Sequence, residues 1–412
     1  MTQLYLATLV DQHFGEKGVT TQITDLRGLK KELQSLSVPE SDLFLYSVAS
    51  PDYSEIKSLV GELRGKYPKS KHIAGGPHIK IFPQECSRVF DAIVIGDGER
   101  SLIQLISDFQ GGHLEPVYNL NADYDSVEYP FARRHYLPEI KIANSNLFKT
   151  AKIRSTSTLL AHGCPFNCSF CANYNRRKAI RRKTPQIIKE IEYLKREYSI
   201  EGVSLLEEIC IPLKEEEAIP YLEAIGNTNI KWRGQIRAGV SEGVLKLARD
   251  SGCLEISFGV ESASQRVVDI ANKRIKLDTV KETIRHCKEN GIKVQIYLLN
   301  GLPGEPPNIV QLTKAFIDET QPDLVIVSSL CPYPGSPIFN NHEYYGIKWI
   351  DHDYEKYNHL VCRFRDSQDN PQDLLPFEYH AKTRWGKALS RKQILDNLFE
   401  LQDFLIERGL NK

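Results

Sequence analysis

Three cysteines, Cys164, Cys168 and Cys171, stand close together at the spacing C-x3-C-x2-C. Thiolates this close on one short loop are soft ligands, and they suit an iron–sulfur cluster or zinc. A closed site of either kind usually takes four protein ligands, whereas only three are clustered here. The spacing therefore predicts a metal site with one coordination position left for a ligand that is not protein. A zinc loop completed by another residue, such as His162, is the alternative.

The composition narrows the class of protein. The chain has 412 residues and is 41% hydrophobic, which favours two domains over one. Lys plus Arg and Asp plus Glu number 53 each, so no net charge favours nucleic acid or a membrane. There is no apolar run of about 20 residues and no signal-peptide pattern, so we expect no membrane span and a cytoplasmic location. Nine cysteines, of which three are clustered, argue against disulfides.

Residues 1–110 alternate apolar runs with amphipathic stretches. This pattern predicts an α/β fold with a parallel sheet and helices on both faces, which is a doubly wound domain. Ligands of such sheets lie at the carboxyl ends of the strands. The expected strands are 4–10, 19–23, 43–48, 72–74 and 92–95, and the expected helices are 29–36, 53–64 and 99–109.

Residues 156–335 contain six strand–helix units. Repeated units of this kind predict an open or closed barrel of parallel strands, whose active site lies at the carboxyl ends of the strands. Residues 111–155 read as a connector, and residues 336–412 as a helical tail that covers the barrel. The expected strands are 158–161, 203–206, 231–236, 254–260, 293–299 and 323–330, and the expected helices are 185–198, 214–225, 242–251, 277–290, 309–320 and 391–407.

The cysteine loop, with Phe170 directly before Cys171, resembles the cluster loop of radical S-adenosylmethionine (SAM) enzymes. The likeness continues in the motif-like stretches at 259–262, 300–305 and 333–337. It implies a [4Fe–4S] cluster on the three cysteines and a partial (β/α)6 barrel. It also implies that SAM chelates the open iron and is cleaved to a 5′-deoxyadenosyl radical, with an electron from a donor such as flavodoxin or ferredoxin.

Polar residues and glycines at the ends of the barrel strands are the SAM contacts that this resemblance implies. Taken singly, each polar strand end is as easily explained by a helix cap or a surface salt bridge. Arg237 carries a planar fork of donors that matches the SAM carboxylate. The candidates, besides Phe170, are Glu208, Gln235, Arg237, Glu261, Ser262, Gly301 and Gly304.

Three strand ends of the first domain resemble those of the cobalamin-binding domain found in cobalamin-dependent radical SAM enzymes. Glycine at such an end lets a flat ligand approach the backbone, although ordinary turns explain each motif alone. The candidate cobalamin contacts are Ser47, Ser50, Gly75, Gly76, Pro77, His78, Gly96, Gly98 and Glu99. The domain departs from the pattern in its short opening segment, and Asp11 and His13 match a cobalt-ligating motif only in part.

The resemblance implies methyl transfer to an unactivated carbon or phosphorus. Two alternatives stay open: another radical SAM reaction, such as cyclisation or rearrangement, with a corrin-free first domain, and a zinc-binding module without activity. Neither the substrate, a small molecule or a peptide, nor a catalytic residue can be named. Residues 176–183 carry six basic side chains, which suit a solvated loop or an anionic substrate. Cys210 and Cys331 lie near strand ends, where buried packing is the more ordinary role.

Overall fold

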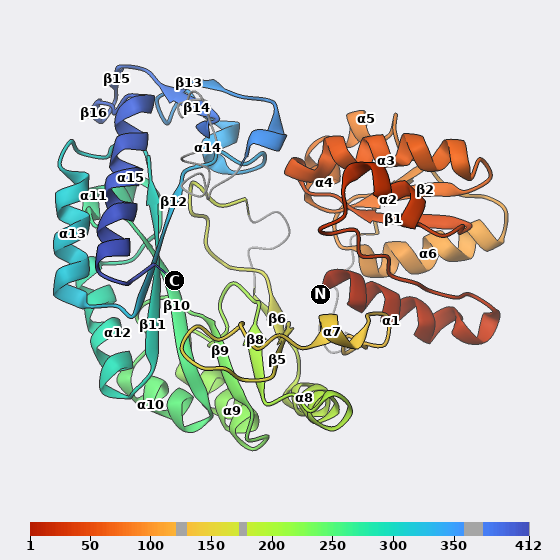
Figure 1. Ribbon diagram of the computed structural model, residues 1–412, viewed down its shortest axis with the longest axis horizontal. Coiled ribbons are helices and arrows are strands. Elements are labelled where there is room, and N and C mark those ends of the chain that lie inside the picture. The colour runs from red at the N-terminus through yellow and green to blue at the C-terminus, as the bar shows by residue number, and fades with distance from the viewer. Residues whose placement is uncertain (121–129, 173–178, 358–373, 412) are drawn as a thin grey trace. The chain divides into compact units, whose positions relative to one another are not determined.

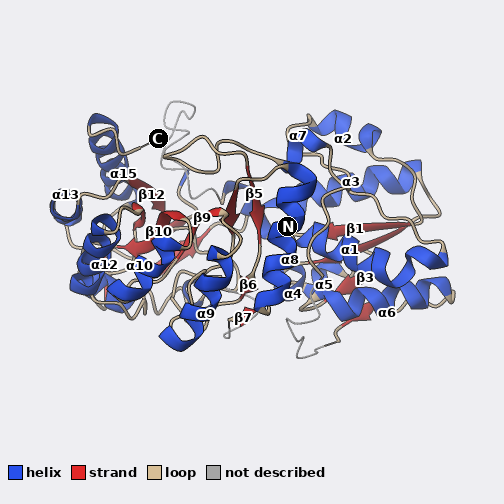
Figure 2. Cartoon of the chain, turned by 90° about the horizontal axis from the view of Figure 1, so that it is seen from below, coloured by secondary structure: helices blue, strands red, loops and turns tan. Residues whose placement is uncertain are grey.

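The computed structural model describes residues 1–120, 130–172, 179–357 and 374–411 (Figure 1). The chain divides into two compact units. The first consists of Met1–Pro138 with Asp353–Glu355, and the second of Glu139–His352 with Lys356–Lys412. Figure 2 shows that strands and helices alternate in both units. No helix in the described ranges is long and apolar enough to cross a membrane.

The first unit contains a parallel sheet with helices on both faces, which confirms the predicted doubly wound arrangement. The four strands stand in the order β1 (Leu43–Ser47), β2 (Lys71–Gly75), β3 (Ala92–Val94) and β4 (Val117–Tyr118). The helices are α1 (Thr2–Phe14), α2 (Lys31–Ser37), α3 (Tyr53–Lys66), α4 (Pro77–Ile81), α5 (Pro83–Cys86) and α6 (Gly98–Gln110).

Alternation along β2 distributes the core between the two faces of this sheet. Ile73 packs with Val10 of α1 and Leu105 of α6, whereas its neighbour Ala74 packs with Val60 of α3. Successive side chains of a strand point to opposite faces, so both helical layers draw on the same short strands.

The predicted strand at 4–10 is wrong, because these residues form helix α1. A short apolar run does not distinguish a strand from a buried helix by periodicity alone. The predicted strand at 19–23 has no regular structure. As a consequence, His13 lies inside α1, where its Nδ1 is 2.9 Å from the carbonyl of Leu9, and does not follow a strand as the cobalt-ligating motif would require.

The second unit is built on an open sheet of six parallel strands in the order β12-β11-β10-β9-β8-β5. The helices form an outer layer along one face of this curved sheet (Figure 1). The strands are β5 (Ser155–Thr158), β8 (Gly202–Leu205), β9 (Lys231–Gln235), β10 (Cys253–Glu261), β11 (Lys293–Asn300) and β12 (Leu324–Ser329), and the helices are α8 (Thr184–Tyr198), α9 (Glu215–Gly226), α10 (Glu242–Asp250), α11 (Gln265–Ile270), α12 (Leu277–Glu289) and α13 (Ile309–Thr320).

The predicted strand at 158–161 is divided. β5 ends at Thr158, and the chain then leaves the sheet as β6 (Ala161–His162), which pairs in the antiparallel sense with β7 (Ile180–Arg181). The cysteine loop lies between β6 and β7, so this small ladder closes its base.

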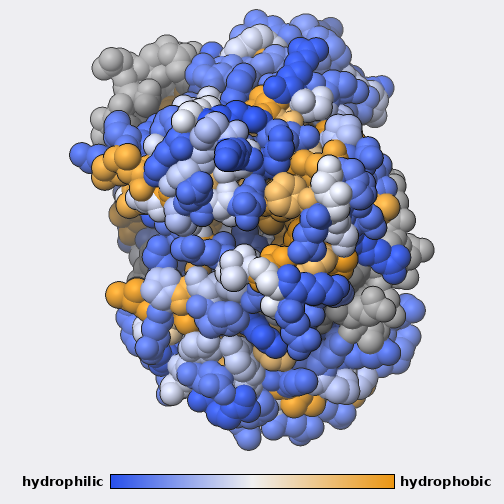
Figure 3. All heavy atoms as spheres, turned by 90° about the vertical axis from the view of Figure 1, so that its right-hand side faces the viewer, coloured by the Kyte–Doolittle hydropathy of each residue, from blue (hydrophilic) through white to orange (hydrophobic). Residues whose placement is uncertain are grey.

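The C-terminal part adds α14 (Pro337–Asn340), β13 (Ile347–Ile350), β14 (Phe377–Tyr379), β15 (Lys382–Thr383), β16 (Gly386–Lys387) and α15 (Arg391–Glu407). α15 begins with a capping box in which Ser390 and Gln393 exchange hydrogen bonds, which explains why its first residue is as predicted. Polar residues cover most of the face in Figure 3, and apolar side chains appear between them in small areas.

Candidate active site

Three hydrogen bonds fasten the cysteine loop to two other parts of the second unit. The amide of Ser169 donates to the carbonyl of Ala271 over 2.8 Å, and Asn272 Nδ2 donates to the carbonyl of Asn167 over 2.7 Å. In turn, the amide of Ile338 donates to the carbonyl of Ser169 over 2.9 Å. The loop is thereby held between the turn that follows α11 and the first residues of α14.

The three thiols differ in exposure. Cys168 is buried, Cys164 is partly buried and Cys171 is exposed. Burial, and then the negative charges of Cys168 and Glu208, raise the pKa of the Cys164 thiol. Glu208, a predicted SAM contact, is exposed and lies close enough to Cys164 to act on it.

The donor set fits a metal cluster in kind and number, since three thiolates stand on one loop. Across the described ranges, however, no three His, Cys, Asp or Glu side chains already converge as a group that could hold a metal ion. Cys164 and Cys168 lie near each other, whereas Cys171 is exposed.

Arg237, which follows β9, reaches this loop. Its guanidinium carbon lies 3.5 Å above the centre of the Phe166 ring, and Nη2 donates to the carbonyls of Lys273 and, over 3.0 Å, Arg274. Burial lowers the pKa of Arg237, and the Cys168 and Cys164 thiolates oppose that shift. The side chain thus ties the cysteine loop to the 273–274 turn and places a positive charge beside two of the thiols.

Glu261 ends β10 with a φ of +66°, beyond an irregularity in the pairing of β10 with β11. Its carboxylate pairs with Lys273 Nζ at 2.6 Å, and both side chains are nearly buried, at 9% and 12% exposure. Lys273 Nζ also lies 5.7 Å from the centre of the Phe170 ring. A Cβ at Gly259 would stand 1.9 Å from Glu261 Oε1, so glycine is required there for this ion pair.

The 300–305 loop follows β11 and is held by its own carboxylate. Gly301 and Gly304 have φ of +90° and +80°, which favours glycine at both positions. Glu305 accepts the amide of Gly301 at 2.9 Å and that of Leu302 at 3.1 Å. Burial raises the pKa of Glu305 to about 8, against the effect of these hydrogen bonds. Tyr379 of β14 donates to the carbonyl of Gly301 over 2.9 Å.

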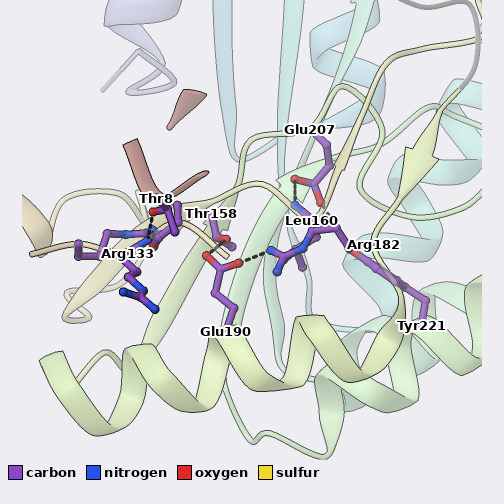
Figure 4. Close-up of polar contacts among 10 residues, drawn as sticks. Thr8, Arg133, Thr158, Leu160, Arg182, Glu190, Glu207 and Tyr221 are labelled. Atoms are coloured by element: carbon purple, nitrogen blue, oxygen red, sulfur yellow. Dashed lines mark hydrogen bonds and ion pairs between the residues drawn. The ribbon is translucent and has the colours of Figure 1, made fainter. Parts of the chain in front are cut away.

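Glu207, next to the predicted Glu208, is the buried member of the pair, at 2% exposure. Its carboxylate accepts a long hydrogen bond of 3.4 Å from Tyr221 and one of 3.5 Å from the amide of Leu160, as Figure 4 shows. Burial raises the pKa of Glu207 to about 7, although Arg181 acts in the opposite direction. Glu207 therefore lies beneath the cysteine loop, and Glu208 lies beside it.

Two arginines of the basic run point into the protein. Arg181 donates to the carbonyls of Ile209 at 2.7 Å and Cys210 at 3.0 Å, and Arg182 forms a buried ion pair with Glu190. At these two positions the basic run is therefore not a solvated loop, which is one of the two interpretations that its charges allow. Residues 176–178 lie outside the described residues.

The other two predicted SAM contacts, Gln235 and Ser262, make only local hydrogen bonds in this structure. The carbonyl of Gln235 accepts the amide of Cys210 at 2.7 Å, and Ser262 Oγ accepts the amide of Ser264 at 3.2 Å. Cys210 and Cys331 are both buried, and burial raises their thiol pKa values, which fits packing residues. No disulfide joins the cysteines within the described residues, and Cys362 lies outside them.

The cobalamin candidates lie at the carboxyl ends of β1, β2 and β3, which are neighbours in the first unit. Gly76 has a φ of +107°, and a Cβ there would stand 2.8 Å from the carbonyl oxygen of Val48. Ser50 Oγ is 3.1 Å from His78 Nδ1, and His78 stacks on Tyr53 at 4.1 Å. His78 is fully buried, and burial lowers its pKa to about 4, so its neutral ring belongs to the core.

The remaining members of this set lie along the same edge. Gly98 is the first residue of α6, and a Cβ there would meet only the side chain of Leu6, at 3.7 Å. Gly96 has a φ of +90°, and Glu99 is in the first turn of α6. Ser47 and Gly75 end β1 and β2, and Pro77 begins α4. The nine residues share one sheet edge, as the sequence predicts for a flat ligand.

The sequence does not single out three residues that shape this site: Phe166, Lys273 and Glu305. Glu305 belongs to a stretch that resembles a family motif, so the sequence contained a signal from which its role could have been predicted. Lys273 is paired through a strand irregularity that no periodicity shows, and Phe166 matters only because Arg237 lies on it.

Comparison with known proteins matches residues 158–317 to the family model described as the Radical SAM superfamily. An uncharacterized methyltransferase of Pyrococcus horikoshii is 26% identical over 366 residues, which cover 82% of this chain and 76% of the relative. The anaerobic magnesium-protoporphyrin IX monomethyl ester cyclase of Cereibacter sphaeroides is 25% identical, and the match covers 86% of this chain but 60% of that enzyme.

Among solved structures, the radical SAM methyltransferase TsrM of Kitasatospora setae, with cobalamin and a [4Fe–4S] cluster bound, superposes with a TM-score of 0.65. The match is 16% identical and covers 83% of this chain and 72% of TsrM. At this identity the likeness shows a shared fold. The three-cysteine loop, the open sheet of six parallel strands and the family match together show that residues 158–317 of this chain are similar to the radical SAM superfamily.

Proposed function

We propose that this radical SAM enzyme carries a [4Fe–4S] cluster on Cys164, Cys168 and Cys171 and uses cobalamin in its first unit to transfer a methyl group to an unactivated centre. The observation that carries the proposal is the set of three cysteines on one loop, because three thiolates would leave one iron of such a cluster without a protein ligand. When bound, the cluster supplies the electron that cleaves SAM, and cobalamin supplies the methyl group.

The side chains of the protein itself would hold the cysteine loop and the SAM-binding loop in place. Arg237 places positive charge beside Cys164 and Cys168, which offsets part of the burial effect that raises the pKa of Cys164. Lys273, paired with Glu261, lies beside the Phe170 ring. Gly301 and Gly304 remain proposed SAM contacts, although a Cβ at either would meet a protein side chain, Ile394 at 3.0 Å and Ile270 at 2.4 Å. Glu305 fixes that loop through two amides. Phe170, Glu208, Gln235, Glu261 and Ser262 remain proposed SAM contacts. Arg237 remains one as well, although its guanidinium already holds two carbonyls.

Two considerations support cobalamin and methyl transfer. The nine candidate residues lie on one edge of a parallel sheet, where such sheets bind ligands. In addition, a relative and a solved structure of similar fold are described as methyltransferases, and the latter holds cobalamin. Most of the nine would offer backbone, because Ser50 and His78 already contact each other.

Cyclisation is the second candidate, because the Cereibacter sphaeroides relative is a cyclase. This chain spans 60% of that enzyme, so the substrate of the relative is not assigned to this chain. Either reaction needs an electron donor such as flavodoxin or ferredoxin and a reducing, cytoplasmic setting, and both are part of the proposal. The substrate, a small molecule or a peptide, stays unnamed.

The test is anaerobic reconstitution with iron and sulfide, followed by metal analysis and titration with hydroxocobalamin. We expect about four irons and four sulfides per chain, since the cluster is of the [4Fe–4S] type, and a corrin absorption band that stays with the protein on gel filtration. Replacement of Cys168 by Ser should abolish cluster loading, whereas the matched change of buried Cys287 should not. One zinc without sulfide would overturn the proposal. A cluster without retained corrin would overturn its cobalamin part.

A further inference from the structure

Glu190 of helix α8 joins the two chain segments on either side of the cysteine loop. Its Oε1 accepts the hydroxyl of Thr158, the last residue of β5, over 2.8 Å. Its Oε2 pairs with Arg182, which directly follows β7. The chain between Thr158 and Arg182 contains all three cysteines, so one carboxylate holds both ends of the loop (Figure 4).

This connection is buried and reinforced by the backbone. The side chains of Arg182 and Glu190 are 3% and 0% exposed. The amide of Arg182 also donates to the carbonyl of Leu160 over 2.9 Å, and the β6–β7 ladder begins beside it. A buried charge that loses its partner is strongly unfavourable, so the two segments are held in one fixed relation.

The same chemistry occurs elsewhere in the unit, away from any cysteine loop. Glu255 Oε1 accepts the hydroxyl of Thr150 over 2.6 Å, and Glu255 Oε2 pairs with Arg233 Nε at 3.1 Å. Those side chains are also largely buried, at 5% and 16% exposure. Glu255 stands near the start of β10, at the opposite end of the strand from Glu261. It is therefore an internal control for the loss of a buried Arg–Glu–Thr group.

We propose that Glu190 is a positioning residue for the cysteine loop, which fixes the base of the loop so that Cys168 stays buried before any metal binds. The inference rests on the proposed function, because ordering the loop matters only if the cysteines bind a cluster. The ordering itself is a property of the chain without metal and can be measured there. Its expected signature is a local change at the loop that the equivalent change at Glu255 does not produce.

The experiment measures alkylation of Cys164, Cys168 and Cys171 by iodoacetamide in the metal-free protein, with peptide mass spectrometry. In the wild type we expect Cys168 to react more slowly than exposed Cys171. Glu190→Gln should raise the Cys168-to-Cys171 rate ratio by about tenfold, the effect of a lost charge-assisted hydrogen bond. Glu255→Gln should leave that ratio unchanged, even where urea unfolding shows a similar loss of stability.

Thr158→Val removes only one hydrogen bond, so it decides the question if Glu190→Gln does not fold. We expect it to raise the ratio by about threefold. An equal rise in Glu255→Gln, or no rise in either loop-base variant, would overturn the inference. Since no cluster is present in this assay, its outcome is independent of whether the loop binds iron, which the reconstitution experiment tests separately.

Discussion

At the scale of single residues, two cationic side chains, Arg237 and Lys273, lie next to the cysteine loop. Each is engaged by the protein itself: Arg237 by two carbonyls and the Phe166 ring, and Lys273 by Glu261. The charge of Arg237 lowers the pKa of the Cys164 thiol and so opposes the effect of burial, which raises it. The contacts of Arg237 and Lys273 also mean that neither cation moves freely when a ligand arrives.

Lys273→Met tests the ion pair with Glu261. The change leaves a nearly buried carboxylate unpaired, so the free energy of unfolding of the metal-free protein should fall by about 3 kcal/mol. The double variant Lys273→Met/Glu261→Gln removes both charges and should lose less. Urea unfolding of the three proteins measures this. Equal losses in the single and double variants would show that the pair is not coupled.

Gly259→Ala tests the close approach of that pair to the backbone. A Cβ would stand 1.9 Å from Glu261 Oε1 and 2.7 Å from Lys273 Nζ, so we expect a loss of about 2 kcal/mol from overpacking. The matched control is Gly243→Ala in α10, where no atom lies within 4 Å of the new Cβ. The control should gain about 0.5 kcal/mol of helix stability. Thermal unfolding that ranks the two variants in the opposite order would contradict the geometry.

The residues of the cysteine loop could be predicted from type and spacing, because the ligands of a cluster must be thiolates and must lie close together on the chain. The contacts that hold the loop could not. Glu261 and Lys273 are separated by a helix, and they meet only because Glu261 adopts a positive φ. Likewise, a buried Arg182 is not expected within a run of basic residues, where a solvated side chain is the ordinary outcome.

At the scale of elements, the carboxyl ends of β8 and β11 place two buried carboxylates near the candidate site. Glu207 follows β8 and Glu305 follows β11. Burial raises the pKa of each, to about 7 and about 8. A carboxyl group with a raised pKa is favourable in the fold only while it keeps its proton.

These two carboxyl groups predict how stability changes with pH. Their pKa values in the fold lie above the ordinary 4.5, so the folded state binds more protons than the unfolded state between these values. The free energy of unfolding should therefore fall as pH rises from about 4.5 to 8, by at most about 1.4 kcal/mol per pH unit for each group.

Urea unfolding of the metal-free protein at pH 5.5, 7 and 8.5 measures this slope. Glu207→Gln should reduce the slope below about pH 7, where both groups contribute, and should leave the contribution of Glu305 up to about pH 8. Glu207→Gln/Glu305→Gln should flatten the curve over the whole range. A double variant with the slope of the wild type would show that other groups cause the dependence.

Most elements of the second unit could be predicted because apolar strands such as β11 and β12 alternate with amphipathic helices such as α12 and α13. α13 and α15 have the predicted bounds. The failures have local causes: α1 is apolar enough to resemble a buried strand, and β4 is too short to show a pattern. β6 leaves the sheet because the cysteine loop must be closed by a ladder of its own, which no apolar pattern signals.

At the scale of the whole molecule, the chain has two compact units, each with its own parallel sheet and its own set of candidate ligand contacts. The predicted boundaries at residues 110, 155 and 335 stay predictions. In the proposed function, the second unit binds the cluster and SAM, and the first unit binds cobalamin. Binding to one unit then stabilises that unit first.

Cobalamin binding predicts an unequal change in unfolding. Hydroxocobalamin at about 100 times its dissociation constant should stabilise the first unit by about 2.7 kcal/mol. Hydrogen exchange followed by mass spectrometry, with and without the corrin, should show slower exchange in peptides of β1, β2 and β3. Peptides of the second unit far from the strand ends, such as those of α10, provide the control. Protection confined to α10 would contradict the assignment.

The most direct test of the central claim is whether the reconstituted protein cleaves SAM. Under anaerobic conditions with dithionite, we predict that the wild type forms 5′-deoxyadenosine, measured by liquid chromatography with mass spectrometry. Cys164→Ser, Cys168→Ser and Cys171→Ser should form none. Equal amounts of 5′-deoxyadenosine from the wild type and any of these three variants, or none from a wild type with a full complement of iron and sulfide, would contradict the account.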